Sequence, residues 1–242
     1  MHSKFTAFEP YENVFIGNFL FGIGLHVGTR LQGRQVPMCI NLLQQSPMDR
    51  LLGDVLLELP GTVRLFEFKR SSNKSAKEHD KAKLLRTAIS GAPALEPVSR
   101  AIHWYVQSFP VRQDEEPRIL LSPYLDFGTT QSAAKEDLAV YIQNLVNDAL
   151  NPHAPRADPN LVRAYLDFVS TWNGAGSVST GGMLVHIDGK GCLRYAVLPD
   201  IRELSLQHSM YVDRYLNGSH ERTRDNSHQH QDRHKSSFEL GR

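Results

Sequence analysis

The stretch GDVLLELPGTVRLFEFKRS (residues 53–71) predicts a β-hairpin, and the rest of the chain is interpreted around it. Two runs rich in Val, Leu and Phe, residues 54–59 and 62–69, are separated by the turn pair Pro60-Gly61. A turn of two or four residues is centred between residues 60 and 61. Facing positions in the two strands then have numbers that add up to 121.

This register places Asp54 opposite Glu67. Opposed residues of an antiparallel pair project to the same face, with Cβ atoms roughly 5 Å apart. Lys69 lies two residues after Glu67 and therefore points to that face as well. The hairpin is expected to bring two carboxylates and one ammonium together.

One interpretation is that these charges are solvated on a half-exposed sheet. Two features argue against it. The strand around Glu67 is otherwise apolar on both faces, with Leu65, Phe66 and Phe68, as in a covered central strand. In addition, two acids side by side repel each other unless a cation lies between them, and a divalent metal ion would supply that charge.

An Asp at the head of a strand, a tight turn and then Glu67-Phe68-Lys69 on the returning strand resembles the PD-(D/E)XK nuclease family. Asp54 matches the first acid of that family, and the pattern extends over the hairpin and the following helix, from Asp54 to about Ser90. Gly53 stands where the family usually has its proline.

The resemblance implies a nuclease that hydrolyses phosphodiester bonds, more likely those of DNA, with Mg²⁺ or Mn²⁺ as cofactor. Asp54, Glu67 and the backbone carbonyl of Phe68 would bind the metal. Lys69 would position the attacking water and stabilise negative charge. An opening helix would add Glu12 to the metal site, although an acid in the first turn of a helix is more simply explained by the helix dipole.

Basic residues cluster just beyond the hairpin and are candidates for contacts with a nucleic-acid backbone. The candidates are Arg70, Lys74, Lys77 and Lys81, followed by Lys83 and Arg86. The alternative is an ordinary solvated helix face, on which neighbouring acids offset the repulsion between the basic residues.

The remaining sequence predicts alternating helices and strands. Helices are expected at 14–27, 76–90, 97–107, 135–150 with Ser132 as the cap, 159–172 and 206–216, strands at 118–127, and a second hairpin at 183–198. Residues 38–43 fit either a strand or a connecting loop.

This order indicates an α/β fold with a central mixed β-sheet flanked by helices and, from the resemblance, a restriction-endonuclease-like core. We expect one domain over residues 1–218, with the core at about 8–127 and a helical elaboration and second hairpin at 128–218. Residues 219–242 are polar and His-rich, which predicts a disordered tail.

Composition, cysteine spacing and the length of the apolar segments argue against several classes of protein. The 242 residues are 40% hydrophobic, which suits a packed core, and the net charge of +1 requires any nucleic-acid surface to be a local patch. The two cysteines match neither a zinc spacing nor a disulfide framework. The apolar run 14–27 is too short for a membrane span, and no secretion signal is seen, so a cytoplasmic location without a membrane partner is expected.

The alternative function is that of a non-catalytic interaction or structural protein, on this fold or on an unrelated α/β fold. In such a protein the acids and the lysine would be buried or scattered, whereas a nuclease needs them to converge at an accessible notch. Because many nucleases of the PD-(D/E)XK type act in pairs, a homodimer or a larger complex is also an expected state.

Overall fold

The structure is a computed structural model that describes residues 8–31, 38–42, 54–59, 62–73, 76–112, 115–129, 135–151, 153–155, 157–172, 182–187 and 193–198. Its helices are α1 (Glu12–Leu31), α2 (Lys77–Ser90), α3 (Glu96–Ile102), α4 (Leu138–Leu150) and α5 (Pro159–Trp172). Its strands are β1 (Met38–Leu42), β2 (Val55–Leu59), β3 (Thr62–Arg70), β4 (His103–Ser108), β5 (Ile119–Pro123), β6 (Glu136–Asp137), β7 (Gly182–Ile187) and β8 (Leu193–Leu198). Two short 3₁₀ turns are η1 (Pro93–Leu95) and η2 (Tyr124–Asp126).

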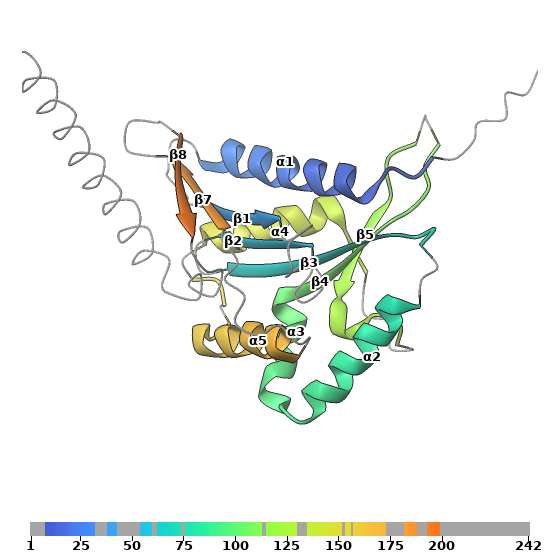
Figure 1. Cartoon of the computed structure of the whole chain (residues 1–242). Coiled ribbons are helices and arrows are strands. Elements are labelled where there is room, and N and C mark those ends of the chain that lie inside the picture. Colours follow the sequence, from blue (N-terminus) through green and yellow to red (C-terminus); the bar gives the residue numbers. More distant parts are fainter. Residues whose placement is uncertain are drawn as a thin grey trace, which may run out of the picture.

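The described strands form one open sheet in the order β6-β5-β4-β3-β2-β1-β7-β8. Neighbours pair antiparallel except β3 and β4, which are parallel, so the sheet is mixed. Helices α1 and α4 cover one face, and α2, α3 and α5 lie on the other (Figure 1). The prediction of an α/β fold with a central mixed sheet and flanking helices is confirmed.

The predicted hairpin register is also confirmed. Val55 pairs with Phe66 and Leu59 with Thr62, so facing numbers add up to 121. Just before β2, the Asp54 amide donates to the Phe66 carbonyl at 2.8 Å, which places Asp54 against the end of this strand pair. Of the two alternatives for residues 38–43 the strand is correct, since β1 pairs antiparallel with β2.

The prediction of one helix over residues 97–107 is wrong. Helix α3 ends at Ile102, and the chain continues directly into β4. The strand is mostly buried and shows no clean alternation of polar and apolar residues, so its sequence resembles the buried stripe of a helix. Its aromatic and β-branched residues favour a strand once β3 is there to pair with.

The other elements largely follow the predictions. Helices at 14–27, 76–90 and 159–172, the strand within 118–127 and the hairpin within 183–198 are present. Helix α4 begins later than predicted, because the Asp137 side chain caps it by accepting from the Ala139 amide at 2.9 Å. Ser132, the helix at 206–216 and the tail at 219–242 lie outside the described residues.

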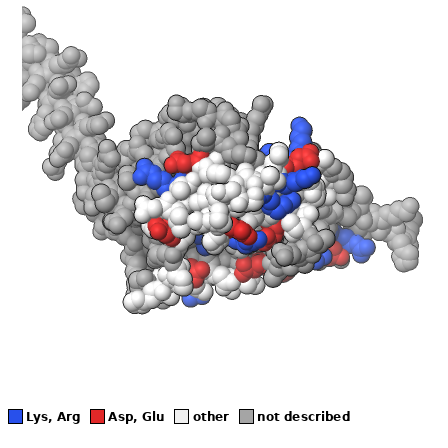
Figure 2. Space-filling view, turned by 90° about the horizontal axis from the view of Figure 1, so that it is seen from below, with Lys and Arg blue, Asp and Glu red and all other residues white. Residues whose placement is uncertain are grey.

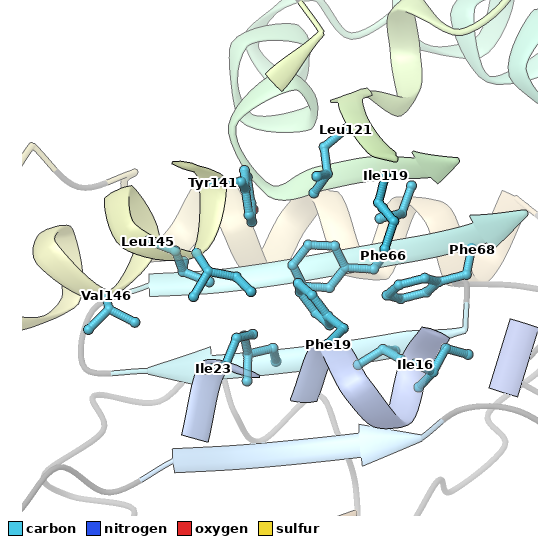
Figure 3. Packing of buried hydrophobic residues seen from close by; sticks show 14 of the residues in the cluster. Ile16, Phe19, Ile23, Phe66, Phe68, Ile119, Leu121, Tyr141, Leu145 and Val146 are labelled. Atoms are coloured by element: carbon cyan, nitrogen blue, oxygen red, sulfur yellow. The ribbon is translucent and has the colours of Figure 1, made fainter. Parts of the chain in front are cut away.

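The core under α1 and α4 fixes which face of β3 carries the charges. The Phe19 ring packs edge-on against Phe66 and Phe68, with ring centroids 4.8 and 5.4 Å away (Figure 3). Burying an aromatic side chain of this size contributes roughly 1.5–3 kcal/mol to stability. Because Phe66 and Phe68 point toward α1, Glu67 and Lys69 point to the opposite face, beneath α2.

Candidate functional site

Asp54 and Glu67 lie side by side at the end of the hairpin, and each is only 4% exposed. Asp54 immediately precedes β2, and its Oδ2 atom accepts a hydrogen bond of 2.6 Å from the Phe68 amide. This bond ties the first acid to the centre of the Glu67-Phe68-Lys69 sequence. The structure therefore brings the two predicted acids together.

The Lys69 ammonium occupies the point where the oxygens converge. Its Nζ atom lies 2.5 Å from Glu67 Oε1, 2.9 Å from the Phe68 carbonyl oxygen and 3.6 Å from Asp54 Oδ2. These three groups are the ones predicted to bind a metal ion. A single cation, here the ammonium, is shared among all of them.

Burial controls the protonation of this cluster. Burial, reinforced by the negative charge of Asp54, raises the pKa of Glu67 to about 8, even though Lys69 opposes the rise. Burial lowers the pKa of Lys69, but attraction to Glu67 and Asp54 outweighs burial and raises that pKa above its ordinary value. Lys69 is therefore a firmly protonated cation, and burial makes Glu67 easier to protonate than an ordinary carboxyl.

Helix α2 adds a third acid and a second lysine that sequence reasoning did not assign to the metal site. Glu78 is buried, and Lys81 lies 3.1 Å from Glu78 Oε1 and 3.9 Å from Glu67 Oε1. The Tyr124 hydroxyl donates to Glu78 Oε2 at 3.0 Å. Spacing offered a signal for Glu78, because residues 78, 82, 85 and 89 form the buried stripe of α2.

Glu12 also lies near the cluster. It stands in the first turn of α1 and is half-buried. Burial raises its pKa, and the charges of Lys69 and Asp54 act on it in opposite senses. A hydrogen bond from the Arg70 backbone to the Glu12 carboxyl further links α1 to the end of β3.

The predicted backbone-binding cations are dispersed rather than aligned. The Arg70 guanidinium lies against buried Glu9, with Nε 3.5 Å from Glu9 Oε2, and over the Tyr11 ring at 5.3 Å. Lys81 belongs to the acid cluster, and Lys77 is exposed at the start of α2. Lys74 lies outside the described residues. Their role in binding nucleic acid stays a prediction.

Glu9, which precedes α1, is buried and hydrogen-bonded to the residues that follow β3. Its carboxylate accepts from the amides of Ser71 and Ser72 at 2.7 and 3.2 Å and from the Ser71 hydroxyl at 3.1 Å. It thereby fixes the turn that follows β3.

A hard divalent cation fits the donor chemistry of the hairpin. Asp54, Glu67 and the Phe68 carbonyl supply oxygen atoms, which Mg²⁺ and Mn²⁺ prefer, and those oxygens already surround one positive charge. The Lys69 ammonium already occupies the position between these oxygens, so Lys69 would have to withdraw for a metal ion to enter. Among the described residues, no group of three or more His, Cys, Asp and Glu side chains is arranged to hold a metal ion.

A pocket of about 220 Å³ opens beside Lys69, between the ends of β3 and β4, the first turn of α2 and the segment after η2. It is lined by Lys69, Ser71, Asn73, Glu78, His79, Tyr105, Gln107 and Phe127. The cluster is therefore adjacent to space that a substrate group can enter.

A buried polar network connects to the site through the hydrogen bond between Tyr124 and Glu78. The His103 ring stacks on Tyr124, with centroids 4.4 Å apart and planes 4° from parallel, and its Nδ1 lies 2.7 Å from the Tyr165 hydroxyl. Burial, aided by the charge of Lys81, lowers the pKa of His103 to about 3. A neutral His103 therefore stacks on Tyr124, and the Tyr124 hydroxyl hydrogen-bonds to Glu78.

On the side of α2 and α5, basic and acidic side chains alternate around an uncharged area of the described surface (Figure 2). This distribution agrees with the net charge of +1 and gives that described face no single-sign patch. No helix within the described segments is long and apolar enough to cross a membrane.

Comparison with known proteins identified no relative. No family model, curated protein or solved structure matches the chain. The functional argument therefore depends on the residues of the site.

Proposed function

We propose that this protein is a metal-dependent nuclease with a restriction-endonuclease-like core that hydrolyses phosphodiester bonds, more likely in DNA. The observation that carries this proposal is the convergence of Asp54, Glu67 and the Phe68 carbonyl on one cation at the end of the hairpin. All three groups match the resemblance found in the sequence.

In this proposal Asp54, Glu67 and the Phe68 carbonyl would hold Mg²⁺ or Mn²⁺, which would supply charge stabilisation and an activated water. A bound cation would favour the ionised form of Glu67, whose pKa is otherwise raised by burial and by the charge of Asp54. Asp54 remains anchored by the Phe68 amide.

Lys69 acts as a charged donor rather than a general base. In the arrangement without a metal ion, attraction to Glu67 and Asp54 outweighs burial and keeps Lys69 protonated. Once displaced from the three oxygens, the ammonium orients the attacking water and stabilises the negative charge that develops on the phosphate. Lys81, between Glu67 and Glu78, keeps the net charge of the cluster low during that movement.

The second candidate is a non-catalytic interaction or structural protein. One observation favours it: both hairpin acids are buried and already paired with Lys69, as in a structural ion network. In that case the charges determine how the hairpin packs, and the protein catalyses no reaction. A homodimer and a cytoplasmic location stay predictions under either function.

The deciding experiment is a cleavage assay on plasmid DNA, single-stranded DNA and RNA with Mg²⁺, Mn²⁺ or EDTA. We expect metal-dependent cutting that Glu67→Gln and Lys69→Met each abolish, while Thr87→Ala, an exposed change on α2, leaves it unchanged. Thermal unfolding of each variant separates loss of chemistry from loss of fold. Absence of cutting on every substrate, with variants that only lower stability, would favour the structural role.

A further inference from the structure

The pocket beside Lys69 has features that go beyond hydrolysis of a backbone. Building on the proposed function above, we propose that this pocket holds one unpaired nucleobase of the strand whose phosphodiester lies at Lys69. The substrate would then be single-stranded nucleic acid or a locally unpaired nucleotide.

One wall of the pocket is aromatic. The rings of Tyr105 and Phe127 stack with centroids 4.0 Å apart and planes 30° from parallel. The His79 ring lies against Phe127 at 4.6 Å and 35°, and it is the exposed member of the three. Stacked aromatic surfaces of this kind bind bases without regard to sequence, because every base has a π face.

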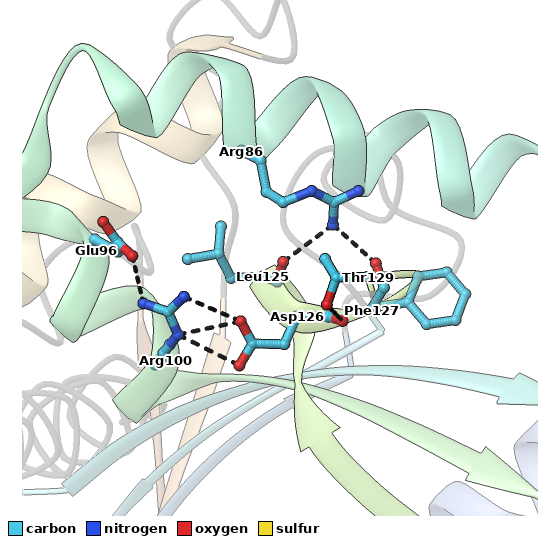
Figure 4. A network of polar contacts seen from close by, with 7 residues as sticks. All are labelled: Arg86, Glu96, Arg100, Leu125, Asp126, Phe127 and Thr129. Carbon is cyan, nitrogen blue, oxygen red and sulfur yellow. Dashed lines mark hydrogen bonds and ion pairs between the residues drawn. The ribbon is translucent and has the colours of Figure 1, made fainter. Parts of the chain in front are cut away.

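The wall is fixed before any ligand arrives. Arg86 of α2 donates to the carbonyls of Leu125 and Phe127 at 3.0 and 2.8 Å, and Arg100 of α3 pairs with Asp126 (Figure 4). These contacts hold the segment that carries Phe127 between two helices. A rigid wall reduces the entropy lost when a ring stacks on it.

Gly128 allows this segment to pass close to His79. Its φ of +74° lies in the left-handed region, and a Cβ atom there would come within 2.7 Å of His79 Nδ1. The glycine therefore fits both the backbone conformation and the close approach of the imidazole.

The other walls are polar and adjoin the hydrolytic residues. Gln107 on β4 is the register partner of Lys69 on β3, and both side chains line the pocket. Neighbouring strands lie roughly 5 Å apart, so a base near Gln107 and a phosphate at Lys69 belong to the same or adjacent nucleotides. The amides of Gln107 and Asn73 can hydrogen-bond to base edges.

The volume argues for one ring system. About 220 Å³ is below the roughly 300–1,000 Å³ of pockets that hold drug-sized ligands. A base within a duplex has both faces stacked and its edge paired, so it must leave the helix to enter a pocket that contacts its face and its edge. An already unpaired base enters at much lower cost.

The test is fluorescence anisotropy with short labelled DNA and RNA strands, single-stranded or as duplexes, in EDTA and in Ca²⁺. We expect the single strands to bind at least about tenfold more tightly than the duplexes. His79→Ala should weaken single-strand binding by about 5-fold to 100-fold, the range of base–aromatic stacking. Gln107→Ala should weaken it by about 2-fold to 10-fold, the range of one hydrogen bond. Both variants should leave duplex binding unchanged. Thr87→Ala, an exposed change on α2, is the matched control.

A series of single strands with one abasic position moved along the sequence gives an independent readout. One base pocket predicts that only one position, fixed relative to the cut, is sensitive. Equal affinity for single strands and duplexes, with no effect of His79→Ala, Gln107→Ala or the abasic position, would overturn the inference.

The same experiments separate this inference from the proposed function. Binding that depends on His79 and Gln107 without cleavage of any substrate would overturn the nuclease and retain the base pocket. Cleavage that depends on Glu67 but ignores the abasic position and the pocket variants would retain the nuclease and overturn the pocket. A preference for DNA or RNA strands identifies the sugar that accompanies the base and supports the pocket.

Discussion

Lys69 Nζ lies 2.5 Å from Glu67 Oε1, and the Glu67 side chain is only 6% exposed. A single residue separates the two on β3. Residues two apart on a strand share a face, so the backbone itself brings these charges together. The pair is therefore built into the hairpin and does not depend on another element reaching across.

Replacing Lys69 with methionine should destabilise the fold. The change leaves Asp54 and Glu67 buried beside each other without their common cation, and breaking a buried pair typically costs about 3–5 kcal/mol. We expect a loss of about 3 kcal/mol in the free energy of unfolding, near the low end because part of Lys69 reaches solvent. Urea unfolding in EDTA measures it, and equal stability of Lys69→Met and Lys83→Met would contradict the prediction.

Glu67 should make the protein less stable as the pH rises. Its folded pKa of about 8 exceeds the ordinary 4.5, so its contribution to stability is fully present below pH 4.5 and is lost as the pH rises through 8. Glu67→Gln cannot titrate. Its unfolding free energy relative to wild type should therefore increase with pH across this window, by up to about 1.4 kcal/mol per pH unit. Urea unfolding across the window in EDTA measures this, and a difference independent of pH would refute it.

His103 should act in the opposite direction. Its folded pKa of about 3 lies below the ordinary 6.5, so its contribution is fully present above pH 6.5 and is lost as the pH falls through 3. His103→Gln retains a partner for Tyr165 but does not titrate. We expect the variant to lose less stability than wild type on acidification, as followed by circular dichroism. Parallel acid unfolding of the two proteins would show that His103 is already charged in the fold.

Removing Arg86 should loosen the segment that carries Phe127. Arg86→Met leaves two carbonyls without their donor, which costs about 1–3 kcal/mol if they stay buried. We expect single-strand binding to weaken more than the loss of stability alone explains, as measured by anisotropy under conditions where both proteins are folded. Arg112→Met is the control, because its ion pair with Glu115 is exposed. Unchanged single-strand binding in Arg86→Met would show that the turn is held by other contacts.

The hairpin could be predicted because its information is local. Pro60-Gly61 sets the turn, and a period of two residues then determines which side chains share a face, so the meeting of Asp54 with Glu67 and Lys69 followed from counting. How deeply the hairpin acids are buried did not follow, because their burial depends on how α2 covers the sheet.

The parts that sequence reasoning missed depend on contacts distant in the chain. Strand β4 was predicted as helix because its partner β3 ends more than thirty positions earlier and leaves no local trace. Tyr124 reaches Glu78 across 46 positions, and no spacing rule connects them. Only Glu78 had a usable signal, its place in the buried stripe of α2.

The parallel pairing of β3 with β4 has a consequence for the order of assembly during folding. The hairpin closes through a local turn, on a scale of roughly 1–10 μs for such units, whereas β4 reaches β3 only after residues 71–102 have formed their crossover. The two acids and Lys69 thus meet while the hairpin is still open to water. Helix α2 excludes water from the site later. By then the negative charges of Asp54 and Glu67 are already offset by Lys69 on the same hairpin.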